Sequence, residues 1–225
     1  MSVVVASPFA SEAELLLAAR RLAGSTLAEA AAAVACAWPS EPVRDKGFIG
    51  RMIERSLGVH SSPSTSDFTE LGVELKTLPV SSRFQPREST FVCYVALASL
   101  IETPWSRSRV SAKLSRVLFV PIESEPGLAL SRRRIGSAFF WSPSLEHTGV
   151  LQSDYEEIAG HVAAGDERLD ARIGRALQLR PKAAHGAVRV HLADGEGRPS
   201  LTQPRAFYLR ARFTAELLRS SFEPA

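Results

Sequence analysis

The sequence lacks the features that define several classes of protein. Only two of its 225 residues, Cys36 and Cys93, are cysteines, too few for a disulfide scaffold. The longest apolar run, Ala28 to Trp38, is interrupted by Glu29 and is far shorter than the roughly 20 residues of a membrane span. Residues 1–10 have no basic stretch before their apolar part, so no signal peptide is indicated. We therefore expect a protein of a reduced, cytoplasmic compartment with no membrane partner.

A large excess of charge of one sign is also missing, because 27 Lys and Arg face 24 Asp and Glu. The charge is nevertheless uneven along the chain. Residues 1–145 carry a net charge of +3, residues 146–170 carry −6, and residues 172–219 carry +7, with nine Arg among ten basic residues. Arginine suits phosphate and base-edge recognition, because its planar guanidinium donates two parallel hydrogen bonds. Taken alone, the last segment is better explained as a solvated basic surface.

Local signals predict helices first and short strands afterwards. Capping boxes at Ser11/Glu14 and Thr26/Glu29 open two helices, and a third is expected from about Gly47 to Leu57 with Asp45 as its cap. Alternating or apolar stretches predict strands at 73–77, 91–97, 116–122, 172–180 and 206–209, and two later helices are predicted at about 153–164 and 213–218. This order predicts an α+β domain with a mixed central sheet.

The most informative stretch runs from Asp67 to Lys76. With a strand period of two, Glu74 and Lys76 lie on one face, about 7 Å apart along the strand. Asp67 precedes the turn-forming Gly72 and can fold back toward them. Because Mg²⁺ prefers oxygen ligands and keeps several waters, Asp67 and Glu74 could hold one and leave room for a phosphate oxygen and a nucleophilic water. Lys76 could activate that water or stabilise charge on phosphorus. An amphipathic surface strand is the alternative.

Glu54, on the preceding predicted helix, adds a further carboxylate to this pattern. The block Arg44-Asp-Lys-Gly-Phe-Ile-Gly, Glu54 and the segment from Asp67 to Val80 together resemble the MutH family of DNA mismatch-repair endonucleases, in the PD-(D/E)XK nuclease superfamily. The resemblance continues in the same order through Glu88–Cys93, Lys113–Pro121, Arg132–Gly136, Trp141–Pro143, Arg180–Ala184, Arg205–Leu209 and Phe213-Thr214. It therefore covers nearly the whole chain, from about Leu15 to Leu218.

The resemblance implies a restriction-endonuclease-like core, a mixed sheet flanked by helices, in a single domain over residues 1–225. Two arms would form a DNA-binding cleft: an N-terminal arm of about residues 1–105 with the catalytic residues, and a C-terminal arm of residues 106–225 with the DNA-reading residues. The family's catalytic positions fall on Asp67, Glu74 and Lys76, and its additional acidic position falls on Glu54. Asp67, Glu74 and Glu54 would then hold Mg²⁺ in a two-metal site, while Lys76 orients the attacking water.

The implied activity is hydrolysis of one strand of duplex DNA at GATC when the adenine of that strand lacks a methyl group. Lys46 matches a family lysine near the DNA, Arg180 and Lys182 suit base-edge acceptors, and Tyr208 matches the tyrosine close to the adenine that is sensed. Phe91 matches a further DNA-recognition position, and Lys113 is a phosphate candidate. Core aromatics and solvated surface charges are the alternatives for these residues.

Three functions are compatible with these sequence features. The first is the methylation-sensitive nicking endonuclease, a monomer with low activity of its own that is switched on by MutL and MutS and acts in the cytoplasm at the nucleoid. The second is a restriction endonuclease that cuts both strands of GATC. The third is a DNA-binding module with a degraded active site, which the presence of all four of Asp67, Glu74, Lys76 and Glu54 argues against. One departure from the family pattern is Ala206, which stands where the family has glycine, so site or methylation specificity could differ.

Overall fold

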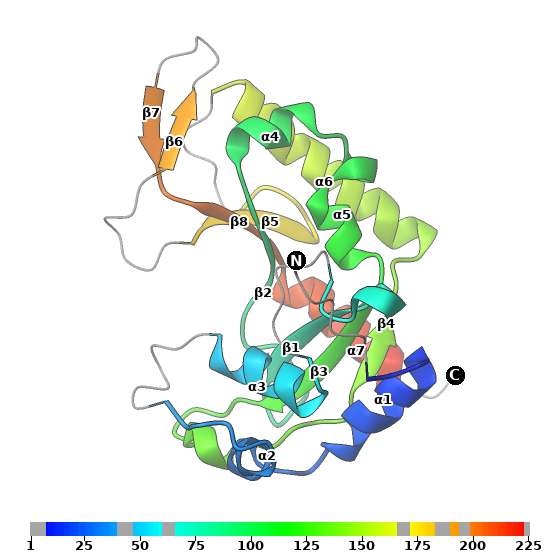
Figure 1. The fold of residues 1–225 in the computed structure, drawn as a ribbon. Coiled ribbons are helices and arrows are strands. Elements are labelled where there is room, and N and C mark those ends of the chain that lie inside the picture. The colour runs from blue at the N-terminus through cyan, green and yellow to red at the C-terminus, as the bar shows by residue number, and fades with distance from the viewer. Residues whose placement is uncertain are drawn as a thin grey trace, which may run out of the picture. The chain divides into compact units, whose positions relative to one another are not determined.

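The computed structural model describes residues 8–39, 47–59, 66–165, 172–182, 190–193 and 199–222. Contacts between residues divide the chain into two compact units. The first comprises Met1–Arg87, Arg116–Ser142 and Leu218–Ala225, and the second comprises Glu88–Ser115 and Pro143–Leu217. Each unit contains its own sheet and helices, which can be followed by colour in Figure 1.

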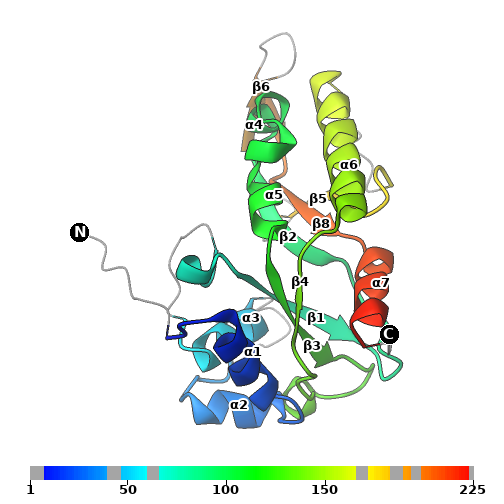
Figure 2. The same ribbon diagram turned by 90° about the vertical axis from the view of Figure 1, so that its right-hand side faces the viewer.

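The first unit is built on a three-stranded mixed sheet. Its strands are β1 (Glu74–Val80), β3 (Val117–Glu123) and β4 (Phe139–Trp141), in the order β1-β3-β4. β1 and β3 are parallel, and β4 is antiparallel to β3. The helices are α1 (Glu12–Arg21), α2 (Leu27–Ala33) and α3 (Phe48–Ser56), with short 3₁₀ turns η1 (Thr69–Leu71) and η3 (Leu130–Arg132). Figure 2 shows α1, α2 and α3 on one side of this sheet. The predicted α+β class with a mixed sheet flanked by helices is confirmed.

The capping signals explain where the first helices begin. Ser11 caps α1 and accepts the Glu14 N–H, and Thr26 and Glu29 form a complete capping box at α2. The predicted cap of α3 is wrong, because Gly47 occupies that position without a side-chain bond, while Asp45 lies outside the described residues. Leu15, Leu27 and Ile53 from these helices pack with Leu118 and Val120 of β3 in one buried cluster. The three helices therefore form a layer packed against the sheet that contains β1 and β3.

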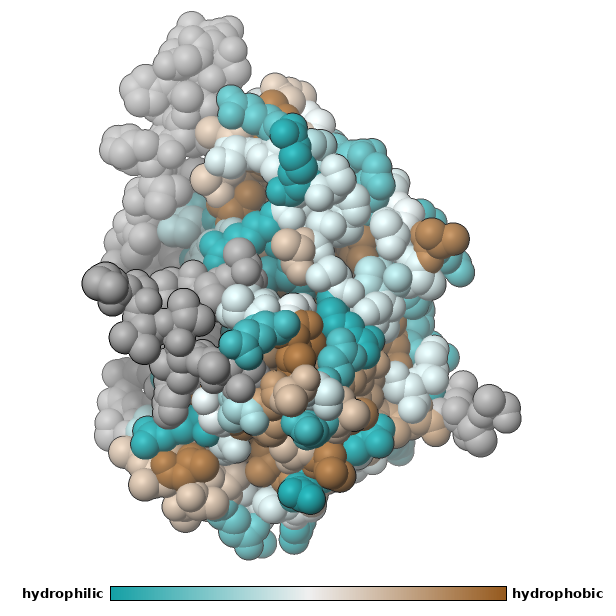
Figure 3. Space-filling view, turned by 45° about the vertical axis from the view of Figure 1, so that its right-hand side comes forward, coloured by the Kyte–Doolittle hydropathy of each residue, from teal (hydrophilic) through white to brown (hydrophobic). Residues whose placement is uncertain are grey.

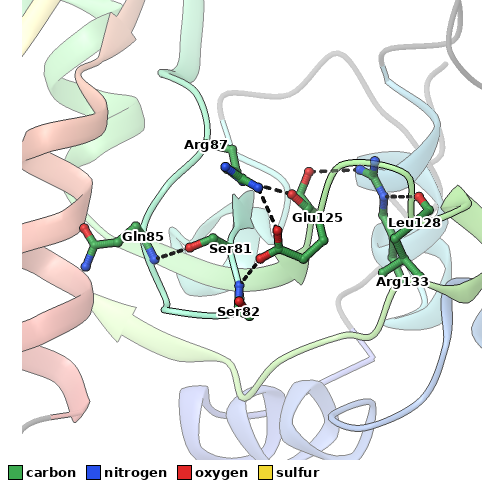
Figure 4. Close-up of polar contacts among 8 residues, drawn as sticks. Ser81, Ser82, Gln85, Arg87, Glu125, Leu128 and Arg133 are labelled. Atoms are coloured by element: carbon green, nitrogen blue, oxygen red, sulfur yellow. Dashed lines mark hydrogen bonds and ion pairs between the residues drawn. The ribbon is translucent and has the colours of Figure 1, made fainter.

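The loop after β1 is held by a cluster of polar contacts, shown in Figure 4. Glu125 accepts the Ser82 N–H, and the Arg87 guanidinium donates to Glu125 over 2.7 Å and to the Ser124 carbonyl over 3.0 Å. Arg133 donates to the Ser124 hydroxyl over 3.0 Å. These bonds link the segments that follow β1 and β3, so polar side chains hold the two neighbouring strands together at their carboxyl ends.

The second unit is built on a three-stranded antiparallel sheet with the order β2-β8-β5. Its strands are β2 (Thr90–Val95), β5 (Leu177–Pro181) and β8 (Arg205–Leu209), and a separate hairpin is formed by β6 (Val190–Ala193) and β7 (Pro199–Thr202). The helices are α4 (Leu97–Glu102), α5 (Arg109–Leu114) and α6 (Leu145–Ala163), with a 3₁₀ turn η2 (Trp105–Arg107). The last helix, α7 (Ala211–Phe222), begins in this unit and ends in the first.

The core of the second unit lies between one face of its sheet and α6. The Tyr155 ring of α6 stacks on the Phe207 ring of β8 at 5.6 Å between centroids, and Trp105 packs against Tyr155 at the same distance. Leu177 and Leu179 of β5 are also buried. Outside the cores, hydrophobic side chains form small separate patches among hydrophilic ones on the face shown in Figure 3. Within the described residues, no helix is both long and apolar enough to cross a membrane.

The predicted arms of residues 1–105 and 106–225 differ from the two compact units, each of which takes segments from both halves of the chain. The reason is the parallel pairing of β1 with β3, because parallel neighbours need a crossover connection. Here the crossover contains β2, α4 and α5, which belong to the second unit. Phe91 therefore lies with Arg180, Lys182 and Tyr208 rather than with the predicted catalytic residues.

Candidate active site

A tight turn brings Asp67 back to the start of β1. The Phe68 N–H donates to the Val73 carbonyl over 2.9 Å, and the Val73 N–H donates to the Phe68 carbonyl over 3.2 Å. Gly72 closes the turn at φ +66°, a left-handed conformation that favours glycine. The buried Phe68 ring anchors the turn. The Asp67 carboxylate consequently accepts the Leu75 N–H over 2.8 Å, which confirms that it folds back toward the strand.

Glu74 and Lys76 lie side by side on β1. The Lys76 ammonium donates to the Glu74 carboxylate, and their side chains are only 12% and 5% exposed for lysine and glutamate. The predicted strand face that the two share is therefore present. The Glu74 N–H donates to the Arg116 carbonyl over 2.9 Å at the start of β3, which fixes the backbone at this point. The result is a buried carboxylate paired with an ammonium at the start of β1, an outer strand of the sheet.

Glu54 comes to the same site from α3. Burial raises the pKa of Glu54, the neighbouring carboxylates of Asp67 and Glu74 raise it further, and Lys76 and Arg51 partly oppose the shift. The four residues predicted from the sequence to act together therefore interact electrostatically within the first unit. Three carboxylates share this site with the ammonium of Lys76, so negative charge gathers in a place with limited access to water.

This donor set can be tested against a divalent metal. Carboxylate oxygens are the ligands that Mg²⁺ prefers, and the mutual repulsion that raises the pKa of Glu54 is the kind that a bound cation relieves. The described residues contain no group of three or more His, Cys, Asp or Glu already arranged to hold a metal ion. Mg²⁺ usually takes one or two carboxylates together with waters and phosphate oxygens, so Asp67 and Glu74 fit by their chemistry.

The second unit carries the aromatic and basic residues predicted to read DNA. Across the strands, Phe91 of β2 and Gln178 of β5 both pair with Tyr208 of β8. The Phe91 and Tyr208 rings meet edge to face at 5.7 Å, and the Tyr94 ring lies 5.4 Å from Phe91. We call this side of the sheet, with Phe91, Tyr94 and Tyr208, the aromatic face. The opposite side of the sheet carries Phe207 and packs on α6.

Two cations lie against the aromatic face. The Lys182 ammonium is 3.4 Å from the Phe91 ring centroid and 5.8 Å from that of Tyr208, and the exposed Arg180 guanidinium is 5.5 Å from the Tyr208 ring. Burial raises the pKa of Tyr208, and the charge of Arg180 partly opposes the shift. At neutral pH Tyr208 is therefore a neutral phenol. Four of the predicted DNA-binding residues, Phe91, Arg180, Lys182 and Tyr208, thus gather on one face.

Two other predicted DNA contacts are not part of this cluster. Lys113 lies on α5 and is only 7% exposed, so its burial argues against a phosphate contact in this conformation. Lys46 lies outside the described residues. Both roles stay predictions. The sequence reasoning also overlooked Tyr94, for which strict alternation along 91–97 gives the opposite side of the strand from Phe91.

Comparison with known proteins identifies the family. The sequence model described as DNA mismatch repair enzyme MutH matches residues 58–154. Proteins named DNA mismatch repair protein MutH from Salmonella paratyphi B (strain ATCC BAA-1250 / SPB7), Salmonella newport (strain SL254) and Salmonella heidelberg (strain SL476) are each 45% identical over 218 residues, which is 96% of this chain and 94% of theirs. The chain belongs to the MutH family. It is accordingly a DNA mismatch-repair endonuclease.

The departure from the family pattern that the sequence predicts falls on β8, at Ala206. Ala206 lies on β8 between Tyr94 of β2 and Arg180 of β5, and it is 0% exposed. Its methyl group is therefore covered by protein. The neighbouring Arg210 and Arg212 donate to the backbone carbonyls of Ile173 and Arg175 over 2.7 and 2.8 Å. These two arginines thus brace the segment that leads into β5.

Proposed function

We propose that this member of the MutH family nicks the unmethylated strand of hemimethylated GATC sites in duplex DNA by Mg²⁺-dependent hydrolysis. The observation that carries the proposal is the gathering of Asp67, Glu74, Lys76 and Glu54, in which Lys76 donates to Glu74 and two carboxylates raise the pKa of the third. No structural need explains three carboxylates and a lysine gathered around one partly buried strand.

The proposed reaction is an in-line displacement at phosphorus. A water oxygen loses a proton and forms the new bond to phosphorus, the bond to the 3′ oxygen breaks, and that oxygen takes up a proton, so the products are a 5′-phosphate and a 3′-hydroxyl. Asp67 and Glu74, with Glu54 at a second position, would hold Mg²⁺, which stabilises negative charge on the reacting oxygens when bound. Lys76 orients the attacking water and stabilises charge that grows on phosphorus. Glu74 in turn holds the Lys76 ammonium in place.

Reading of the site is assigned to the second unit. Arg180 and Lys182 donate to base-edge acceptors, of which guanine offers two in the major groove. Tyr208 and Phe91 contact the bases, and a methyl group on the adenine exocyclic nitrogen would crowd Tyr208 and remove one hydrogen-bond geometry. Because Tyr208 stays a neutral phenol, it discriminates by shape and hydrogen bonding rather than by charge.

The proposed partners follow from the family. MutL, and MutS through it, would switch on a monomer whose own activity is low, and the reaction would take place in the cytoplasm, where the DNA lies.

A strand-resolved gel assay tests this function. Unmethylated, hemimethylated and fully methylated GATC duplexes are incubated with Mg²⁺, with and without MutL. We expect nicks in unmethylated strands only, resistance of the fully methylated duplex, and faster nicking with MutL. Cleavage of both strands in one encounter would instead identify a restriction endonuclease, and binding without any nicking would identify a DNA-binding module.

A further inference from the structure

An irregularity in β2 changes which side chains reach the aromatic face. In a regular strand, residues three positions apart point to opposite sides. Here Phe91 pairs with Tyr208, Cys93 pairs with Phe207 and Tyr94 pairs with Ala206, so Val92 is an extra residue that forms a β-bulge. Val92 and Cys93 are both buried, at 1% and 3% exposure. The bulge therefore turns Phe91 and Tyr94 to the same side of the sheet.

Tyr94 is the outermost ring of this group. It is 52% exposed, while Phe91 and Tyr208 are half-buried. The Lys182 ammonium lies 5.5 Å from the Tyr94 ring centroid, and the Tyr94 phenol also acts on Tyr208 by raising its pKa. A single exposed aromatic residue needs no explanation on a protein surface. An exposed ring that touches a second ring and a lysine, on a face turned by a bulge, offers apolar contact area beside a cation, which suits packing against the groove of a DNA duplex.

We propose that Tyr94 is a further DNA-contacting residue, which packs its ring against the sugar and base of duplex DNA beside Phe91. The inference rests on the proposed function. Because the ring carries no charge and reads no base edge, it adds affinity for GATC and for other duplexes alike, whereas Arg180 and Tyr208 discriminate between them. Because Tyr94 belongs to the second unit, whereas Asp67, Glu74 and Lys76 belong to the first, its loss should weaken binding and leave the chemical step unchanged.

Three variants test the role. Tyr94→Ala removes the ring, Tyr94→Phe keeps it, and Ile101→Ala truncates a side chain of α4 with a similar exposure, 49%, that is not part of the aromatic face. Affinity for a fluorescent hemimethylated GATC duplex is measured without divalent metal over a series of salt concentrations. Nicking with Mg²⁺ is then measured over a range of duplex concentrations, and thermal denaturation checks that each variant is folded.

For Tyr94→Ala we expect an affinity about five- to tenfold lower, because an aromatic contact side chain is truncated, with an unchanged slope of log affinity against log salt, because no cation is removed. The KM for nicking should rise by the same factor at an unchanged kcat. Tyr94→Phe should lie within about twofold of wild type, because it retains the aromatic ring, and Ile101→Ala should match wild type.

Wild-type affinity in Tyr94→Ala would overturn the inference. A flatter salt slope would also overturn it, because Tyr94 would then act by holding Lys182 rather than by touching DNA. Failure of the wild-type protein to bind the duplex would overturn the proposed function and the inference together, so the two failures are distinguishable.

Discussion

A buried carboxylate, that of Asp154, holds the backbone of the second unit where β5 begins. It lies on α6 and is 2% exposed, and its carboxylate accepts three successive backbone N–H groups. Oδ1 accepts from Arg175 over 2.8 Å, and Oδ2 accepts from Ala176 over 2.6 Å and from Leu177 over 2.8 Å. Gly174, at φ +82°, immediately precedes this turn. Asp154 therefore fixes the point at which the chain enters β5, the strand that carries Arg180.

The three hydrogen bonds to the Asp154 carboxylate set the loss of stability expected when it is removed. Asp154→Ala leaves three backbone N–H groups without their acceptor, two of them buried and that of Arg175 partly buried, and each buried group costs about 1–3 kcal/mol. Since water and local relaxation recover part of that cost, we expect a loss of about 3–5 kcal/mol in the free energy of unfolding. Asp154→Asn keeps one oxygen but turns an NH₂ group toward a backbone N–H, so we expect about 2 kcal/mol. Glu157→Gln, an exposed change on the same helix, should stay within about 0.5 kcal/mol.

Urea denaturation of the three variants measures these differences, and binding of a GATC duplex measures their effect on β5. We expect the loss in free energy of unfolding to be largest for Asp154→Ala, smaller for Asp154→Asn and smallest for Glu157→Gln. Under conditions where it is fully folded, Asp154→Asn should also bind DNA more weakly. A loss of less than 1 kcal/mol for Asp154→Ala would refute the assignment of Asp154 as the residue that holds this turn.

Three further predictions concern the candidate active site and the aromatic face. Glu54→Gln should lower nicking about 10- to 100-fold. The pKa of Glu54 is raised in the folded state, so the stability of the wild-type protein falls as the pH rises from the unfolded to the folded pKa of this group. At pH 8 Glu54→Gln should therefore melt at a higher temperature than metal-free wild type, by about 2–4 °C for each kcal/mol of stability gained. An unchanged melting temperature would count against a buried charge at Glu54. Gly72→Ala, at φ +66° with open space around it, should lose about 1–2 kcal/mol through backbone strain in denaturation experiments, and an unaltered stability would show that the turn relaxes. Arg180→Ala should reduce the ratio of affinities for GATC and non-GATC duplexes about tenfold, and an unchanged ratio would remove it from base reading.

Local signals in the sequence were sufficient for the elements around the candidate active site. The Ser11 cap and the capping box at Thr26 define the starts of α1 and α2, and the period of two places Glu74 beside Lys76. Asp67 could be placed because a short turn through Gly72 leaves little choice of path. These features depend on neighbours in the chain, which is why a single sequence reveals them.

Features that depend on distant contacts were not predictable. The bulge at Val92 follows from pairing with β8, more than a hundred residues away, and the regular alternation expected for 91–97 therefore misplaced Tyr94. The short helices α4 and α5, of six residues each, offer too few turns for a periodic pattern, and the burial of Lys113 follows from the packing of α5. The start of α6 was expected near Ser153, whereas the helix begins eight residues earlier, at Leu145. Ser144 caps it there by accepting the His147 N–H.

The most direct test uses one hemimethylated GATC duplex with a different fluorophore on the 5′ end of each strand. Wild-type protein and Lys76→Ala are compared with Mg²⁺ for nicking and without it for binding. We predict that wild type cuts only the unmethylated strand and leaves a 3′-hydroxyl, and that Lys76→Ala binds the duplex with wild-type affinity but produces no nick. Full nicking by Lys76→Ala, or cleavage of the methylated strand by wild type, would contradict the account.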